Sequence, residues 1–100
     1  GLAMTNSIAA KVIANDGQLM FGGQPRGICG DATRAASVAQ TKMCRQALSD
    51  ADQKLDLIGV GGISTADHVR EYLGAGATSV ALATAAMVNP DVGLQIRSQL

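Results

Sequence analysis

Residues 57–67, with the sequence LIGVGGISTAD, constrain the fold of this chain more than any other segment. The first four residues carry no charge and are rich in aliphatic side chains, which is typical of a parallel strand buried on both faces. Gly61 and Gly62 have no Cβ, so a phosphate can approach their N–H groups closely, and a helix beginning nearby adds its positive dipole end. The turn is either a cradle for a phosphate-bearing cofactor or a plain strand-to-helix connection.

A second glycine-rich turn precedes another helical pattern. Residues 21–31 hold four glycines and one proline. Asp31 is placed to cap a helix near 31–48, whose helical repeat includes Val38 and Met43. Two glycine-bounded helix starts favour one shared phosphate site, which TIM barrels often build from the loops after their last two strands.

Short apolar runs alternate with helical patterns along the chain. Parallel strands are expected near 2–5, 57–60 and 79–83, and helices near 31–48, 65–74 and 90–100. An Asn-Asp-Gly turn at 15–17 indicates a small hairpin or excursion before the first helix. Strands and helices that alternate with short connections predict an α/β fold with a parallel sheet.

The chain is too short for a closed TIM (β/α)8 barrel. Such a barrel takes about 250 residues, so these 100 residues would form about its last three βα units. A partial barrel leaves two unpaired sheet edges. We therefore expect residues 1–100 to be a piece of a longer chain, completed by the remainder of the barrel, or to associate with copies of themselves as a homo-oligomer.

The two later helices carry recognisable start signals. Ser64 with Asp67 approximates a capping box, and the helix that follows has a stripe ending at Leu73 that is expected to be buried. His68 is expected to face solvent on this helix. Asn89 is expected to cap the last helix, with a proline in its first turn.

Composition limits the partners and the location. Eight basic residues balance eight acidic ones, so no net field attracts nucleic acid or an anionic membrane. Cys29 and Cys44 lack metal-ligand spacing and His68 is the one histidine, which argues against a zinc site within this chain. Free thiols and the lack of an apolar stretch of about 20 residues predict a cytoplasmic protein with no membrane segment in this chain.

Polar side chains follow two of the expected strands. Asn6 and Ser7 come after the first strand, and Thr84 after the last. Ligands bind at the carboxyl ends of parallel strands in this fold class. The alternative for Asn6 and Ser7 is a loop in which they bond the local backbone.

The same segments resemble a known family in order and spacing. They are Asn6-Ser7, the glycine loop ending at 27–30, and the segments 58–63, 71–77 and 80–84. Together they resemble the C-terminal part of the dihydroorotate dehydrogenase family over nearly the whole chain. The resemblance implies an FMN-containing TIM barrel that oxidises dihydroorotate to orotate in pyrimidine biosynthesis and passes a hydride to flavin N5.

The resemblance also assigns roles by position. It implies that Asn6 and Ser7 bind the polar edge of the pyrimidine. It places the FMN phosphate on the cofactor-binding residues Gly30, Gly61, Gly62, Ala83 and Thr84. Ala83 stands where the family has glycine, and an insertion at 24–26 shifts the glycine loop.

No catalytic residue is expected in this chain. The family's general base, its lysines near the flavin and its first five strands all correspond to segments upstream, and Cys29 lies inside the phosphate loop. We therefore expect the 100-residue chain alone to be inactive. The electron acceptor, whether fumarate, NAD through an iron–sulfur partner or quinone, depends largely on segments outside it.

Two other functions remain open from the sequence. One is another FMN barrel oxidoreductase that acts on a pyrimidine, similar to dihydropyrimidine dehydrogenase or dihydrouridine synthase. Asn6 and Ser7 favour a free pyrimidine over tRNA, as does the lack of a basic patch. The other is a non-catalytic partial barrel that persists by self-association and binds no ligand.

Overall fold

Three parallel strands form the centre of the computed structural model, which describes all 100 residues. They are β1 (Leu2–Met4), β4 (Leu57–Val60) and β5 (Ser79–Ala81), in the order β1-β4-β5. The register pairs Leu2 with Leu57 and Val60 with Ala81. The α/β fold with a parallel sheet is confirmed, although β1 and β5 end before the limits of 2–5 and 79–83 expected for them.

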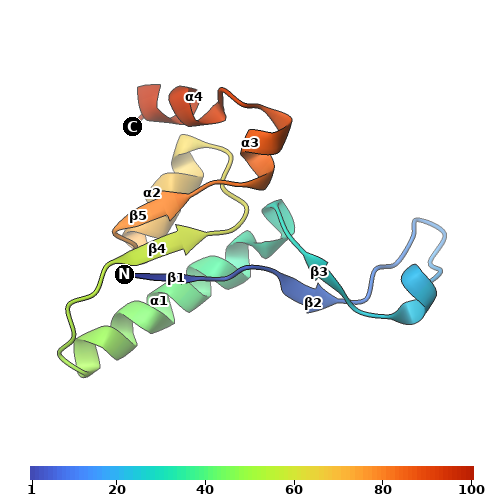
Figure 1. Cartoon of the computed structure of the whole chain (residues 1–100), viewed down its shortest axis with the longest axis horizontal. Helices are drawn as coiled ribbons and strands as arrows, with labels where there is room; N and C mark the ends of the chain where they lie inside the picture. Colours follow the sequence, from blue (N-terminus) through green and yellow to red (C-terminus); the bar gives the residue numbers. More distant parts are fainter.

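The strand order follows the chain order, so right-handed crossovers place the connecting helices on one face of the sheet. The helices α1 (Arg34–Asp50) and α2 (Ala66–Gly74) contact each other as well as the strands (Figure 1). In β4, Leu57 and Gly59 are buried while the alternate residues are only partly buried. The expectation that this strand is buried on both faces is therefore wrong for its second face.

The fully buried residues by which α1 packs on β4 are small and polar, and of the predicted apolar repeat Val38 is partly buried against the core. A 3₁₀ turn, Asp31–Thr33, leads into α1, and the buried residues on this face are Thr33, Ser37 and Thr41. Met43 is 72% exposed. At Thr33 and Ser37, α1 and the turn that leads into it lie too close to the turn after β4 for larger side chains. Asp31 does not cap the helix, because its carboxylate forms an ion pair with Arg34.

The N-cap of α2 lies one residue later than predicted. The Thr65 Oγ1 accepts the N–H of His68 at 3.2 Å, so Thr65 is the cap and Ser64 is not. The buried residues of α2 are Ala66, Val69 and Tyr72. Leu73, expected in this stripe, is 44% exposed. His68 is half-buried, and its Nδ1 accepts the N–H of Ser64 at 3.3 Å.

The C-terminal segment contains two helices where one was expected. The unexpected helix is α3 (Thr84–Val88), and α4 (Val92–Ser98) is shorter than the predicted 90–100. Asp91 is the N-cap position of α4, and the Asn89 Oδ1 accepts its N–H at 3.2 Å, so Asn89 forms a turn before the helix. The main apolar cluster joins α2 to α4 and consists of Ile63, Ala66, Val69, Tyr72, Ala77, Val92 and Ile96.

A two-stranded hairpin extends from the carboxyl end of β1, away from the sheet (Figure 1). It pairs β2 (Ile8–Ala10) with β3 (Arg26–Ile28) in antiparallel register. The predicted excursion around the Asn-Asp-Gly turn is confirmed, and Gly17 has a φ of +83° there. No helix of the structure combines the length and apolar character needed to cross a membrane.

Candidate functional site

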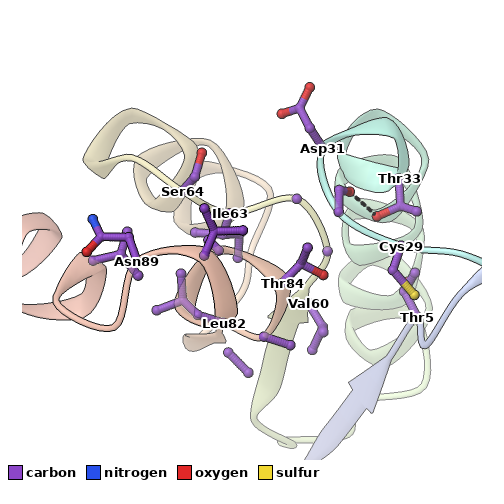
Figure 2. A pocket seen from close by; sticks show the side chains of 18 of the residues that line it. Thr5, Cys29, Asp31, Thr33, Val60, Ile63, Ser64, Leu82, Thr84 and Asn89 are labelled. Carbon is purple, nitrogen blue, oxygen red and sulfur yellow. Dashed lines mark hydrogen bonds between the residues drawn. The ribbon is translucent and has the colours of Figure 1, made fainter.

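A cavity of about 480 Å³ opens at the carboxyl edge of the parallel sheet. It is lined by residues that follow each strand, Thr5 and Asn6 after β1, 61–64 after β4 and 82–85 after β5, together with residues 29–31 before α1. Figure 2 shows side chains from all these segments around one space. Parallel strands bring their carboxyl ends to one edge of the sheet, so segments distant in sequence meet there.

Six of the seven predicted site residues line this cavity. They are Asn6, Gly30, Gly61, Gly62, Ala83 and Thr84. Ser7 does not line it. Its Oγ lies only 2.9 Å from the position that a Cβ of Gly27 would occupy, so this side chain faces the hairpin strand β3.

The turn after β4 lies against the start of α1 so closely that only glycine fits. Gly61 has a φ of +125°, and a Cβ there would lie 2.7 Å from the Ser37 Oγ and 2.8 Å from the Thr33 Oγ1. Gly62 has a φ of +65°, and a Cβ there would lie 2.9 Å from the Gly30 carbonyl oxygen. Both positions favour glycine by backbone conformation and by space. The two glycine turns predicted from the sequence are therefore in direct contact.

The glycine loop before α1 is fixed by Thr33. The Gly30 carbonyl accepts the Thr33 N–H at 3.0 Å and the Thr33 Oγ1 at 2.9 Å (Figure 2). Gly30 has a φ of +79°, and a Cβ added there would lie 3.5 Å from the Thr84 Cγ2. The segments after β4, after β5 and before α1 thus converge around Gly30.

Three backbone N–H groups at the cavity have no acceptor in the protein. Gly61, Gly62 and Ile63 lie outside every helix and strand, and none donates to a backbone carbonyl or to a side chain. All three residues line the cavity. Successive free N–H groups in a glycine turn form a concavity suited to an anion, and the N-terminal end of α1 nearby adds positive potential.

The charge at the cavity comes from one residue. Asp31 is the one charged residue among those that line it, and its carboxylate points away from the other labelled side chains (Figure 2). It pairs with Arg34, whose Nε also lies 3.4 Å from a Glu71 carboxylate oxygen. Arg34 therefore offsets negative charge beside the free N–H groups.

Sequence reasoning missed the residues that support the turn from behind. These are Thr33, Arg34, Ser37 and Tyr72. Tyr72 is fully buried, and burial raises the pKa of its phenol above the ordinary value. No local pattern marks these residues, because each contacts the turn from a helix 11 or more positions away.

Comparison with known proteins now identifies the family. The model of the dihydroorotate dehydrogenase family matches residues 1–100. The chain belongs to the dihydroorotate dehydrogenase family. Its relatives in this family include two proteins named dihydroorotate dehydrogenase B (NAD(+)), catalytic subunit, from Bacillus pumilus and Oceanobacillus iheyensis. Each is 33% identical over 101 aligned residues, which cover 100% of this chain.

The match covers only part of those relatives. A protein of the same name from Desulforudis audaxviator is 34% identical over 100 residues, or 99% of this chain. The matched region is 31% of the Bacillus and Desulforudis proteins and 32% of the Oceanobacillus protein. The chain therefore spans about a third of the length of these dihydroorotate dehydrogenase relatives.

Proposed function

We propose that this chain is the C-terminal, FMN-phosphate-binding part of an oxidoreductase that converts dihydroorotate to orotate in pyrimidine biosynthesis. The relatives are named for this reaction. The single observation that carries the cofactor assignment is the row of unpaired N–H groups at Gly61, Gly62 and Ile63. The residues fit a phosphate, because three successive backbone N–H groups without an acceptor in the protein belong to residues that line the cavity.

In this proposal three backbone segments hold one phosphate. Gly30 contributes from the loop before α1, Gly61 and Gly62 from the turn after β4, and Ala83 and Thr84 from the segment after β5. Ala83 has a φ of −134° and a ψ of −77°, which lie outside the main α and β regions, so the chain holds alanine here in an uncommon backbone conformation. FMN, when bound, would supply a hydride acceptor.

The pyrimidine would bind at the same edge of the sheet. Asn6 lines the cavity, and its side-chain amide can both donate and accept hydrogen bonds with a polar ring edge. Ser7 is the second proposed contact, and it reaches the cavity only if it turns away from Gly27. Asp31, the one carboxylate at the cavity, pairs with Arg34, and the resemblance to the family places the general base upstream of this chain, so we expect the chain alone not to oxidise dihydroorotate.

The rest of the TIM barrel would complete the sheet. Both β1 and β5 have an unpaired edge. Large apolar side chains are exposed outside the hairpin, among them Met43, Met87, Val88 and Leu94. Either the preceding strands of a longer protein or further copies of this chain would cover these groups. The two free thiols, Cys29 and Cys44, accord with a reducing cytoplasm.

Flavin binding tests the proposal. The purified chain is titrated with FMN and with riboflavin, which lacks the phosphate, and flavin fluorescence is followed. Because hydrogen bonds to a charged group contribute about 1.5–3 kcal/mol, we expect FMN to bind at least about tenfold more tightly. Equal affinities would contradict the phosphate cradle. No binding of either flavin would favour the non-catalytic partial barrel.

Replacing Asp31 with asparagine should strengthen FMN binding. The carboxylate lies at the cavity rim, at the helix end where a phosphate is expected, and its negative charge disfavours an anion there. Charges at helix ends contribute about 0.3–1 kcal/mol, which corresponds to about a two- to fivefold gain in affinity. Asp67→Asn, on the outer surface of α2, is the matched control and should leave the affinity unchanged. Weaker binding by Asp31→Asn would show that the carboxylate is needed to position Arg34.

A further inference from the structure

We propose that Tyr72 is a positioning residue for the phosphate cradle, although it lies outside the cavity. Its buried phenol would set the direction in which the N–H groups of Gly61 and Gly62 point. The inference rests on the proposed function, because it concerns how the same cradle is held ready for a phosphate.

The single O–H of the phenol faces two successive carbonyl groups. The Tyr72 hydroxyl donates to the Gly61 carbonyl oxygen at 2.7 Å and lies 3.2 Å from the Val60 carbonyl oxygen. The peptide bonds are all trans, and in a trans peptide the C=O and the following N–H point in opposite directions. Carbonyls turned toward Tyr72 therefore direct the N–H groups of Gly61 and Gly62 away from it. These are two of the three unpaired donors at the cavity.

Arg34 holds the next carbonyl in the same way. Its Nη1 donates to the Gly62 carbonyl oxygen at 3.3 Å, which directs the Ile63 N–H away from Arg34. The contact is longer than that of Tyr72, and the side chain is partly exposed. Together the two side chains account for the orientation of all three free N–H groups. Tyr72 makes the shorter hydrogen bond and therefore contributes more to this orientation.

The turn needs such a restraint because glycine does not provide one. The peptide between Gly61 and Gly62 has no Cβ on either side, so rotation of this peptide meets little local steric resistance. On the side of α1, the hydroxyls of Thr33 and Ser37 occupy the space beside Gly61. The ring of Tyr72 is held independently by its packing under Gly59, where a Cβ would lie 2.3 Å from the Tyr72 Cδ1. Loss of the hydroxyl alone would free the peptide while the ring stays in place.

The test is Tyr72→Phe, measured by titration of the chain with FMN and with riboflavin. We expect the affinity for FMN to fall about five- to tenfold, in line with the loss of one or two hydrogen bonds. The affinity for riboflavin should stay unchanged, because riboflavin has no phosphate to bind the N–H groups. Tyr72→4-aminophenylalanine keeps the ring and an N–H donor, and it should restore the preference for FMN.

Ile96→Val is the matched control for a loss of stability. Ile96 is buried in the same apolar cluster but does not line the cavity, and its truncation costs about 0.5–1.5 kcal/mol. It should leave the ratio of FMN to riboflavin affinity as in the unaltered chain.

Three results would overturn the positioning role of Tyr72. They are a fall in affinity for neither flavin, an equal fall for both, which leaves the ratio of FMN to riboflavin affinity unchanged, or failure of Tyr72→Phe to fold as judged by circular dichroism. If the unaltered chain itself shows no preference for FMN, the proposed phosphate site fails, and the inference fails with it. A preference in the unaltered chain that survives in Tyr72→Phe rejects the positioning role alone.

Discussion

Gly62→Ala is expected to lower the affinity for FMN by at least about tenfold, because the substitution separates the two glycine turns. A Cβ at this position would lie 2.8 Å from the Arg34 Cβ, 2.9 Å from the Gly30 carbonyl oxygen and 3.0 Å from the Asp31 Cα. Two of these atoms belong to the backbone and cannot rotate away. Overpacking of this kind costs about 1–3 kcal/mol, and a displaced turn no longer presents its N–H groups to one phosphate. Fluorescence titration with FMN measures the loss.

Gly74→Ala is the matched control. This glycine ends α2, and a Cβ there meets no atom within 4 Å. The same chemical change should therefore leave FMN affinity intact and, as a helical substitution, raise stability by up to about 1 kcal/mol. Equal FMN affinity in Gly62→Ala and Gly74→Ala would show that contact between the two turns is not required for binding.

Tyr72→Ala is expected to lower the free energy of unfolding by about 3–5 kcal/mol, the usual cost of removing a large buried ring. The side chain is 0% exposed and fills the space between β4 and α2. Its loss also leaves the carbonyls of Val60 and Gly61 without their donor. Only 13 of 100 residues are buried, so we expect this one change to abolish cooperative unfolding in urea.

The neighbouring residue provides the control for this prediction. Leu73 lies on the same helix but is 44% exposed, so Leu73→Ala should cost less than about 1 kcal/mol. Urea denaturation followed by circular dichroism compares the two variants. A cooperative transition in Tyr72→Ala with a midpoint similar to that of Leu73→Ala would contradict the assignment of Tyr72 as the main side chain of the core.

The parts of the fold that sequence predicted well are those with a strong local signal. The uncharged aliphatic run at 57–60 ends in Gly61 and Gly62, and the structure has β4 and a turn at those positions. The Asn-Asp-Gly turn marks the hairpin for the same reason, because its conformation depends on a few adjacent residues. The meeting of the turns that contain Gly30 and Gly62 followed from the parallel order of the strands.

Interactions between distant segments account for most of the errors. The stripe of α2 was predicted through Leu73, but the glycine at position 59 leaves space for the ring of Tyr72, which takes the buried position. Apolar periodicity could not find the buried face of α1, because that face is made of hydroxyl side chains such as Ser37. The helix α3 lies in a short run of small apolar residues that also suits a strand end.

The site residues that were predicted correctly also had a local signal, and those that were missed depend on contacts between distant segments. Glycines are required by backbone conformation, so their positions in the cavity could be inferred from the turns alone. Ser7 was paired with Asn6 because the two are adjacent in sequence, yet the hairpin draws the Ser7 side chain toward Gly27. Tyr72 and Arg34 gave no signal, since their relation to the turn exists only in the folded chain.

The central claim is that one phosphate is held by backbone N–H groups from three segments of the chain. Amide resonances of the ¹⁵N-labelled chain, followed by NMR during titration with FMN and then with riboflavin, test it at each residue. We predict that FMN shifts the amides of Asp31, Gly61, Gly62, Ile63 and Thr84, and that riboflavin leaves them in place. FMN shifts confined to other parts of the chain, such as the hairpin, or identical shifts with riboflavin, would contradict it.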